Sequence, residues 1–80
     1  MKVYMLKETH ISGDYHFETI EIYSTHRKAA IEFNRIVNKL NENYIEGVEK
    51  VKSINDFVLY EPGHYNENRI VISIIEREVL

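Results

Sequence analysis

The sequence predicts an α+β fold, in which a four-stranded, mainly antiparallel sheet carries one main amphipathic helix on one face. Two stretches rich in β-branched and aromatic residues, 3–9 and 17–23, flank a turn at 12–14. Between residues 29 and 44, apolar side chains recur every three or four positions, as in a helix. Two more apolar stretches, 57–60 and 70–75, follow. The expected order is therefore ββα(α)ββ, with the second helix optional.

The composition limits the function classes. Eighty residues fit a single domain, 1–80, and such a chain buries only about 60–65% of the surface that its unfolded form exposes. A net charge of −3 argues against binding to nucleic acid or to an anionic membrane. The absence of cysteine excludes disulfides and thiolate metal sites. The first residues resemble neither a secretion signal nor a membrane span, so a cytoplasmic location without membrane association is expected.

The first two strands are predicted to form a hairpin, because Ser12-Gly13-Asp14 supplies turn residues between them. His10 and His16 flank this turn and are therefore candidates for a pair of metal ligands. Zinc sites in proteins use three or four protein ligands, and only two carboxylates lie nearby. The interpretation as a plain turn is therefore preferred, and neither a metal nor a cofactor is expected.

The helix is expected to begin after Ser24 or Thr25, since a hydroxyl at that position accepts a hydrogen bond from the first helical turn. Its predicted buried stripe consists of Ala29, Ala30, Phe33, Ile36, Val37, Leu40 and Tyr44. Charged residues occupy the opposite side, which indicates a solvated face.

The stretch after the helix is ambiguous. Val48 and Val51 continue the helical stripe, whereas Gly47 is typical of a helix end. We expect a break near Gly47 followed by a second short helix. Residues 61–69, which begin with Glu-Pro-Gly, are expected to form a longer loop between the last two strands.

Three of the four predicted strands are apolar on both faces, although an antiparallel sheet with one covered face normally alternates apolar and polar residues. Val3 and Met5, for example, alternate with Tyr4 and Leu6. One helix covers one face, so the other must be covered by a second copy, by the 44–54 segment or by another protein. A homodimer through the sheet is the preferred option, because two-fold dimers are the commonest oligomers.

No local motif indicates catalysis. The chain lacks the glycine-rich phosphate loops, the HExxH and GxSxG motifs and the EF-hand pattern. No spacing brings a general acid and a general base together. We therefore expect a protein that is not an enzyme.

The leading interpretation is a small protein-binding module that acts by occlusion, through an apolar sheet face or edge and the 61–69 loop. Tyrosine suits recognition because it offers a large contact area with few rotors and a polar tip. Acidic residues would steer the encounter. The expected partner-binding residues are Tyr4, Leu6, Tyr60, His64, Tyr65, Val71 and Ile75.

The alternative is a binder of nucleic acid or of a phosphate ligand that uses the helix start. The first turn of a helix presents unpaired N–H groups and a positive dipole end, which favour an anion. The residues expected to bind it are Ser24, Thr25, His26, Arg27 and Lys28. Phosphate contacts would make the affinity fall steeply with salt, whereas an apolar face would not.

The stretch VYMLKE, the hairpin and then IEIYSTHRKAAIEF resemble small bacterial and bacteriophage proteins of unknown function. In those proteins a strand ending in Tyr-Ser-Ser/Thr leads into a helix with a basic residue before Ala. The matching residues are Tyr23, Ser24, Thr25, Lys28 and Ala29. The resemblance covers about the first half of the chain and implies a phage or prophage accessory protein that binds and blocks a host protein. It assigns no functional residue.

Overall fold

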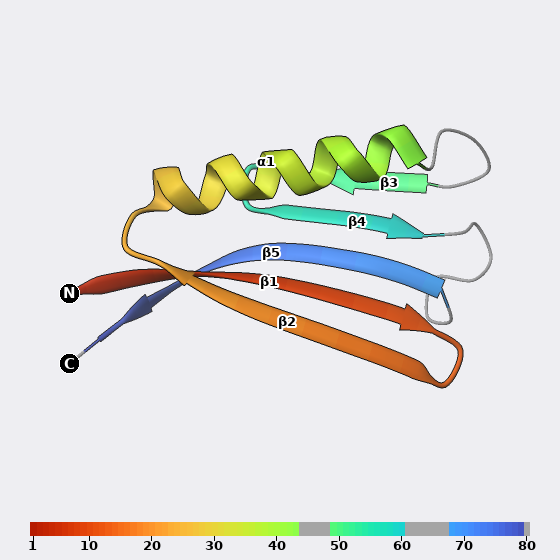
Figure 1. The fold of residues 1–80 in the computed structure, drawn as a ribbon, viewed down its shortest axis with the longest axis horizontal. Coiled ribbons are helices and arrows are strands. Elements are labelled where there is room, and N and C mark those ends of the chain that lie inside the picture. The colour runs from red at the N-terminus through yellow and green to blue at the C-terminus, as the bar shows by residue number, and fades with distance from the viewer. Residues whose placement is uncertain (44–48, 61–67, 80) are drawn as a thin grey trace.

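The computed structural model describes residues 1–43, 49–60 and 68–79. One helix lies across one face of a five-stranded sheet (Figure 1), which confirms the α+β class and the single main helix. The elements are β1 (Lys2–Ser12), β2 (Tyr15–Tyr23), α1 (His26–Asn43), β3 (Glu49–Lys52), β4 (Asp56–Tyr60) and β5 (Asn68–Glu78). The sheet order is β2-β1-β5-β4-β3, and every neighbouring pair is antiparallel.

The expected second helix is replaced by a strand, which adds a fifth member to the sheet. Residues 49–52 pair with β4, and Val51 lies opposite Val58. A backbone hydrogen bond of 2.8 Å from Ser53 N to Asp56 O closes the turn between the two strands. The helical interpretation was wrong because two valines three residues apart are too few to establish a helical period, and so short a helix has too few hydrogen bonds to offset its nucleation.

The β1–β2 hairpin forms as the turn residues predict. Ser12 lies opposite Tyr15, so Gly13 and Asp14 make a two-residue turn. Gly13 has a φ of 58°, and no other described residue has a positive φ. A positive φ at the first central position matches a type II′ turn, whose twist suits the right-handed twist of paired strands.

Helix α1 begins at its predicted cap. The Thr25 hydroxyl accepts a 3.2 Å hydrogen bond from the backbone N–H of Lys28. Ala29, Phe33 and Val37 from the predicted stripe are fully buried against the sheet. Tyr44, the last member of that stripe, lies outside the described residues.

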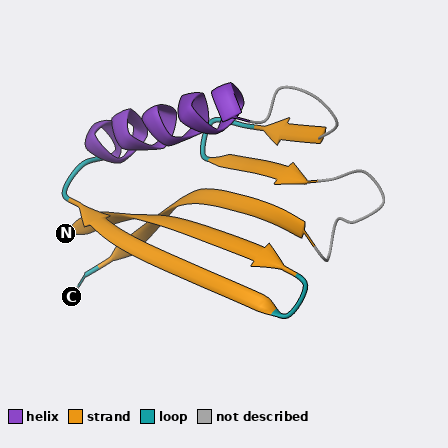
Figure 2. Ribbon diagram, turned by 45° about the vertical axis from the view of Figure 1, so that its right-hand side comes forward, coloured by secondary structure: helices purple, strands orange, loops and turns teal. Residues whose placement is uncertain are grey.

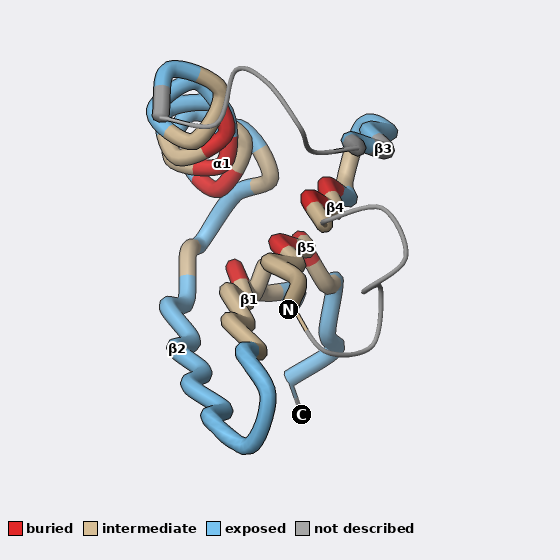
Figure 3. Tube along the Cα trace, turned by 90° about the vertical axis from the view of Figure 1, so that its right-hand side faces the viewer, coloured by how far each residue is buried: buried red, intermediate tan, exposed pale blue. Residues whose placement is uncertain are grey.

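The hydrophobic core lies between α1 and the middle of the sheet (Figures 2 and 3), where β1, β5 and β4 run side by side. Leu6 of β1 lies opposite Ile74 of β5, and Ile72 of β5 lies opposite Phe57 of β4. All four side chains are buried beneath the helix. The helix therefore covers one face of the sheet and leaves the other face, here called the open face, on the far side.

Within the described ranges, α1 is not both long and apolar enough to cross a membrane.

Candidate interaction surface

The open face is rich in apolar side chains. Because side chains alternate along a strand, every residue next in sequence to a helix-facing one points away from the helix. The apolar and aromatic residues placed there by the strand registers are Val3, Met5, Ile11, Ile20, Ile22, Val58, Tyr60, Val71 and Ile75. No segment within 1–43, 49–60 or 68–79 packs over them as α1 packs over the other face (Figure 3). This face therefore combines apolar character with access to a partner.

Polar groups divide the open face. Lys7 Nζ lies 3.4 Å from a carboxylate oxygen of Glu18, an ion pair that bridges β1 and β2. A shallow depression runs beside this pair over β2, β1 and β5. It is lined by Lys7, Thr9, Ile11, His16, Glu18, Arg69, Val71, Ser73 and Ile75. A protein that binds here must match both the apolar side chains and these charges.

The structure separates the expected partner-binding residues into two faces. Tyr60, Val71 and Ile75 share the open face. Tyr4 and Leu6 do not, because their partners in β5, Glu76 and Ile74, lie on the helix side. His64 and Tyr65 lie outside the described residues.

Tyr4 and Leu6 are therefore corrected from partner-binding residues to core and core-edge residues. Leu6 is 4% exposed, and Tyr4 packs against the core with its ring 5.7 Å from the ring of His26. On β1 the accessible residues are their neighbours Val3 and Met5. The 44–54 segment does not cover the open face through its described residues, since β3 lies within the sheet at its edge.

Sequence reasoning missed two of the most accessible residues of the open face. Ile20 and Ile22 are 47% and 66% exposed on β2. A signal was present, because Thr19 and Glu21 alternate with them as in a half-solvated strand. That pattern shows that the two isoleucines share a face, but it does not show that the helix lies on the opposite side.

The two histidines of the first hairpin do not form a pair. His10 lies opposite Phe17 on the helix side, whereas His16 lies opposite Ile11 on the open face. His10 instead lies 3.1 Å from a carboxylate oxygen of Glu8. Among the described residues, no group of three or more histidines, aspartates and glutamates is arranged to hold a metal ion.

The helix start uses several of its polar groups internally. His26 Nε2 lies 2.7 Å from the side-chain oxygen of Asn55, and its ring contacts Tyr4 edge to face. Thr25 caps the helix, and Lys28 Nζ lies 3.4 Å from the hydroxyl of Ser24. Arg27 is exposed. The five residues Ser24–Lys28 therefore adjoin one another, but His26 is directed into the fold and not toward a common anion.

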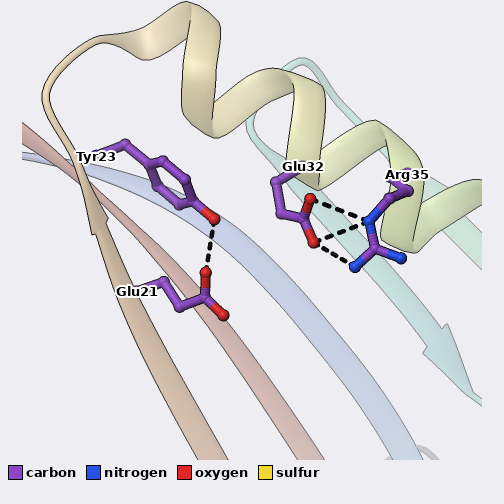
Figure 4. A network of polar contacts seen from close by, with 4 residues as sticks. All are labelled: Glu21, Tyr23, Glu32 and Arg35. Carbon is purple, nitrogen blue, oxygen red and sulfur yellow. Dashed lines mark hydrogen bonds and ion pairs between the residues drawn. The ribbon is translucent and has the colours of Figure 1, made fainter.

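A second hollow lies on the helix side, between α1 and the β1–β2 hairpin. Its floor is apolar, with Leu6, Ile36 and Leu40, and its walls carry charged side chains from both elements. Two hydrogen-bonded pairs stand at this groove (Figure 4). The Tyr23 hydroxyl donates a 2.6 Å hydrogen bond to Glu21, and the Arg35 guanidinium donates to Glu32, with Nε 2.9 Å from Oε1.

These contacts shift two pKa values in opposite directions. The hydrogen bond to Glu21 is the main cause that raises the pKa of Tyr23 from 10.0 to about 12, with burial and the Glu21 charge adding to it. The hydrogen bond from Arg35 lowers the pKa of Glu32. The Glu32–Arg35 ion pair is exposed to solvent and therefore contributes little to the stability of the fold. Its main effect is to make the wall of the groove polar.

The Tyr23 shift gives a titration prediction. Because the folded-state pKa is raised, the stabilisation is present below the ordinary value of 10.0 and is lost as the pH rises through about 12. A tyrosinate absorbance titration of the folded protein should contain a late component that Tyr23→Phe lacks and Glu21→Gln moves to lower pH. Tyr15→Phe, at the exposed hairpin, should retain it. A late component that persists in Tyr23→Phe would contradict the assignment.

A scan of the chain against protein-family models finds no match, and searches of curated proteins and of solved structures find none either.

Proposed function

We propose that this chain is a protein-binding module whose recognition surface is the open face of the sheet. The observation that carries the proposal is the row of apolar side chains on that face, opposite the helix-covered core. Soluble monomers usually limit continuous exposed apolar patches to a few hundred Å², and larger ones commonly mark interaction sites. A partner protein on the open face would explain why the strands are apolar on the side that α1 does not cover.

Binding would work by occlusion. The partner's apolar side chains would pack on Met5, Val71 and Ile75, while its polar groups meet the Lys7–Glu18 pair and Arg69. The buried centre would supply most of the affinity, and the charged residues would select orientation and partner. The resemblance of residues 3–8 and 20–33 to small bacterial and bacteriophage proteins of unknown function implies a phage accessory protein, for which a host protein would be the target and blocking the outcome.

Capture experiments with the tagged full chain in bacterial lysate test this proposal. Val71→Asp and Ile22→Asp place a charge on the open face, and both should lose the captured protein while keeping the wild-type circular dichroism spectrum. Ile31→Asp is the matched control, because Ile31 is 63% exposed on the outer side of α1. Capture by Ile31→Asp and by the wild type should persist at high salt, because an apolar interface depends little on salt. Binding through phosphate contacts would instead weaken steeply as the salt concentration rises.

Two results would contradict the proposal. One is capture of the same protein by Val71→Asp and the wild type alike. The other is loss of capture in Arg27→Glu with Lys28→Glu but not in the open-face variants, which would favour the anion-binding alternative. No specific contact favours that alternative, because the cap and the His26–Asn55 hydrogen bond already engage part of the helix start.

A further inference from the structure

The two edges of the sheet differ sharply. β3 is an edge strand of four residues that includes the exposed Lys50 and Lys52. Short length and lysine are common ways in which proteins protect a sheet edge from pairing with another chain. β2, at the other edge, has nine residues and contains no Lys, Arg, Pro or Gly. Its nine partners in β1 follow one another without a bulge.

β2 also concentrates exposed apolar surface. Tyr15 and Phe17 on the helix side are 61% and 45% exposed, and Ile20 and Ile22 on the open face are similarly accessible. Figure 3 shows β2 exposed along almost its whole length, in contrast to the neighbouring strand. An edge that is long, regular and apolar is a template for a further strand.

We propose that the outer edge of β2 pairs antiparallel with β2 of a second copy, around a two-fold axis at Phe17. The sequence of the strand is self-complementary in this register. Phe17 meets Phe17 of the other copy, His16 lies opposite Glu18 on both sides of the axis, and Tyr15 lies opposite Thr19. Aromatic pairs and pairs of a histidine with a carboxylate are favourable cross-strand neighbours.

Other registers are poorer. Pairing centred on Glu18 would set two carboxylates directly opposite each other, which is unfavourable. Pairing centred on Thr19 or Ile20 would place Glu18 opposite an isoleucine. The register at Phe17 uses the hairpin end of β2, from Tyr15 to Thr19. This end lies away from the connection between β2 and α1 (Figure 1).

The two-fold axis would stand perpendicular to the sheet. The two five-stranded sheets would then join into one of ten strands, with both helices on one side and both open faces on the other. The dimer thus goes beyond the proposed binding surface, because it presents two copies of that surface side by side. A protein with two matching sites would bind both with increased avidity.

Light scattering behind size exclusion, at a low and a high protein concentration, tests the association. Pairing along five residues of each strand is a small interface, so the mass should rise with concentration from 9.5 kDa toward twice that value. Phe17→Lys should remain monomeric, because two like charges would meet at the axis. Ile75→Asp, which alters only the open face, should still dimerise. A wild type that is monomeric at both concentrations, or an Ile75→Asp variant that is monomeric, would overturn the proposal.

Crosslinking tests the register. The natural chain contains no cysteine, so one introduced thiol can react only with its equivalent in another copy. Phe17→Cys should form a disulfide-linked dimer under mild oxidation, because directly opposite residues bring their Cβ atoms to about 4.5–5.5 Å. Ile22→Cys is the matched control, since Ile22 is more exposed but lies outside the paired stretch. Equal or faster crosslinking of Ile22→Cys would overturn the register.

A charge exchange gives an independent check. Glu18→Lys should weaken the dimer, because it sets a lysine opposite His16 of the other copy. Adding His16→Glu to it should restore the dimer by forming a pair of opposite sign. Failure of the double variant to recover the wild-type mass would contradict the His16–Glu18 pairing. These readouts need no partner protein, so they are independent of the capture experiment that tests the open face.

Discussion

Leu6→Asp is expected to prevent folding, whereas Met5→Asp, one residue earlier on the same strand, is expected to fold. Leu6 is 4% exposed beneath α1 and lies opposite the buried Ile74. A carboxylate at this position would lose its hydration without gaining a partner, at a cost of several kcal/mol. Small domains are stabilised by only about 5–15 kcal/mol, and a chain of this size belongs near the lower end.

Met5 is the matched control because it points to the open face, beside Lys7 and opposite Ile22 and Ile75. Asp at this position remains accessible to water, so the expected loss is about 1 kcal/mol. Circular dichroism and urea unfolding of both variants measure the difference. If both fold with similar midpoints, or if Met5→Asp alone unfolds, the assignment of the two sheet faces is wrong.

Phe33→Ala should cause the second large loss, about 3–5 kcal/mol, because it leaves a cavity at the centre of the core. Phe33 is 1% exposed and belongs with Phe57, Ile72 and Val37 to the largest fully buried side chains. Because this loss is comparable with the whole free energy of unfolding of the domain, Phe33→Ala should be largely unfolded at room temperature. The midpoint of urea unfolding measures the effect.

Two further variants keep this prediction informative. Phe33→Leu retains part of the buried volume and should show a smaller shift within the measurable range. Ile31→Ala, two residues away on the exposed side of α1, should change the free energy of unfolding by only about 0.5 kcal/mol or less. Similar losses for Phe33→Leu and Ile31→Ala would be incompatible with the packing of α1 on the sheet.

The sequence predicted the helix well because helix periodicity and capping are local properties. Ala29, Phe33 and Val37 are the deepest residues of α1, and Thr25 caps it, as their spacing indicates. The first hairpin was equally predictable, since Gly13 supplies the positive φ that its two-residue turn requires. In both cases the deciding interactions join residues at most a few positions apart.

The sequence does not determine which face of β1 meets the helix, and the prediction that Tyr4 and Leu6 lie on the uncovered face was wrong. Val3 and Met5 are as apolar as Tyr4 and Leu6, so alternation divides the strand into two sets without ranking them. The residues of β5 that pack under α1 make the choice, and they are about 70 positions away along the chain. The candidate site was therefore half predicted: Tyr60, Val71 and Ile75 lie on the open face, while Tyr4 and Leu6 belong to the core side.

By itself, the sequence determined the α+β class, the helix with its cap and buried stripe, the hairpin turn and the excess of apolar residues on the strands. Only the tertiary structure decided the strand order, the fifth strand and the position of β2 at an edge. The physical reason is range: turns and helices form from near neighbours, whereas strand order and face depend on hydrogen bonds and packing between distant segments.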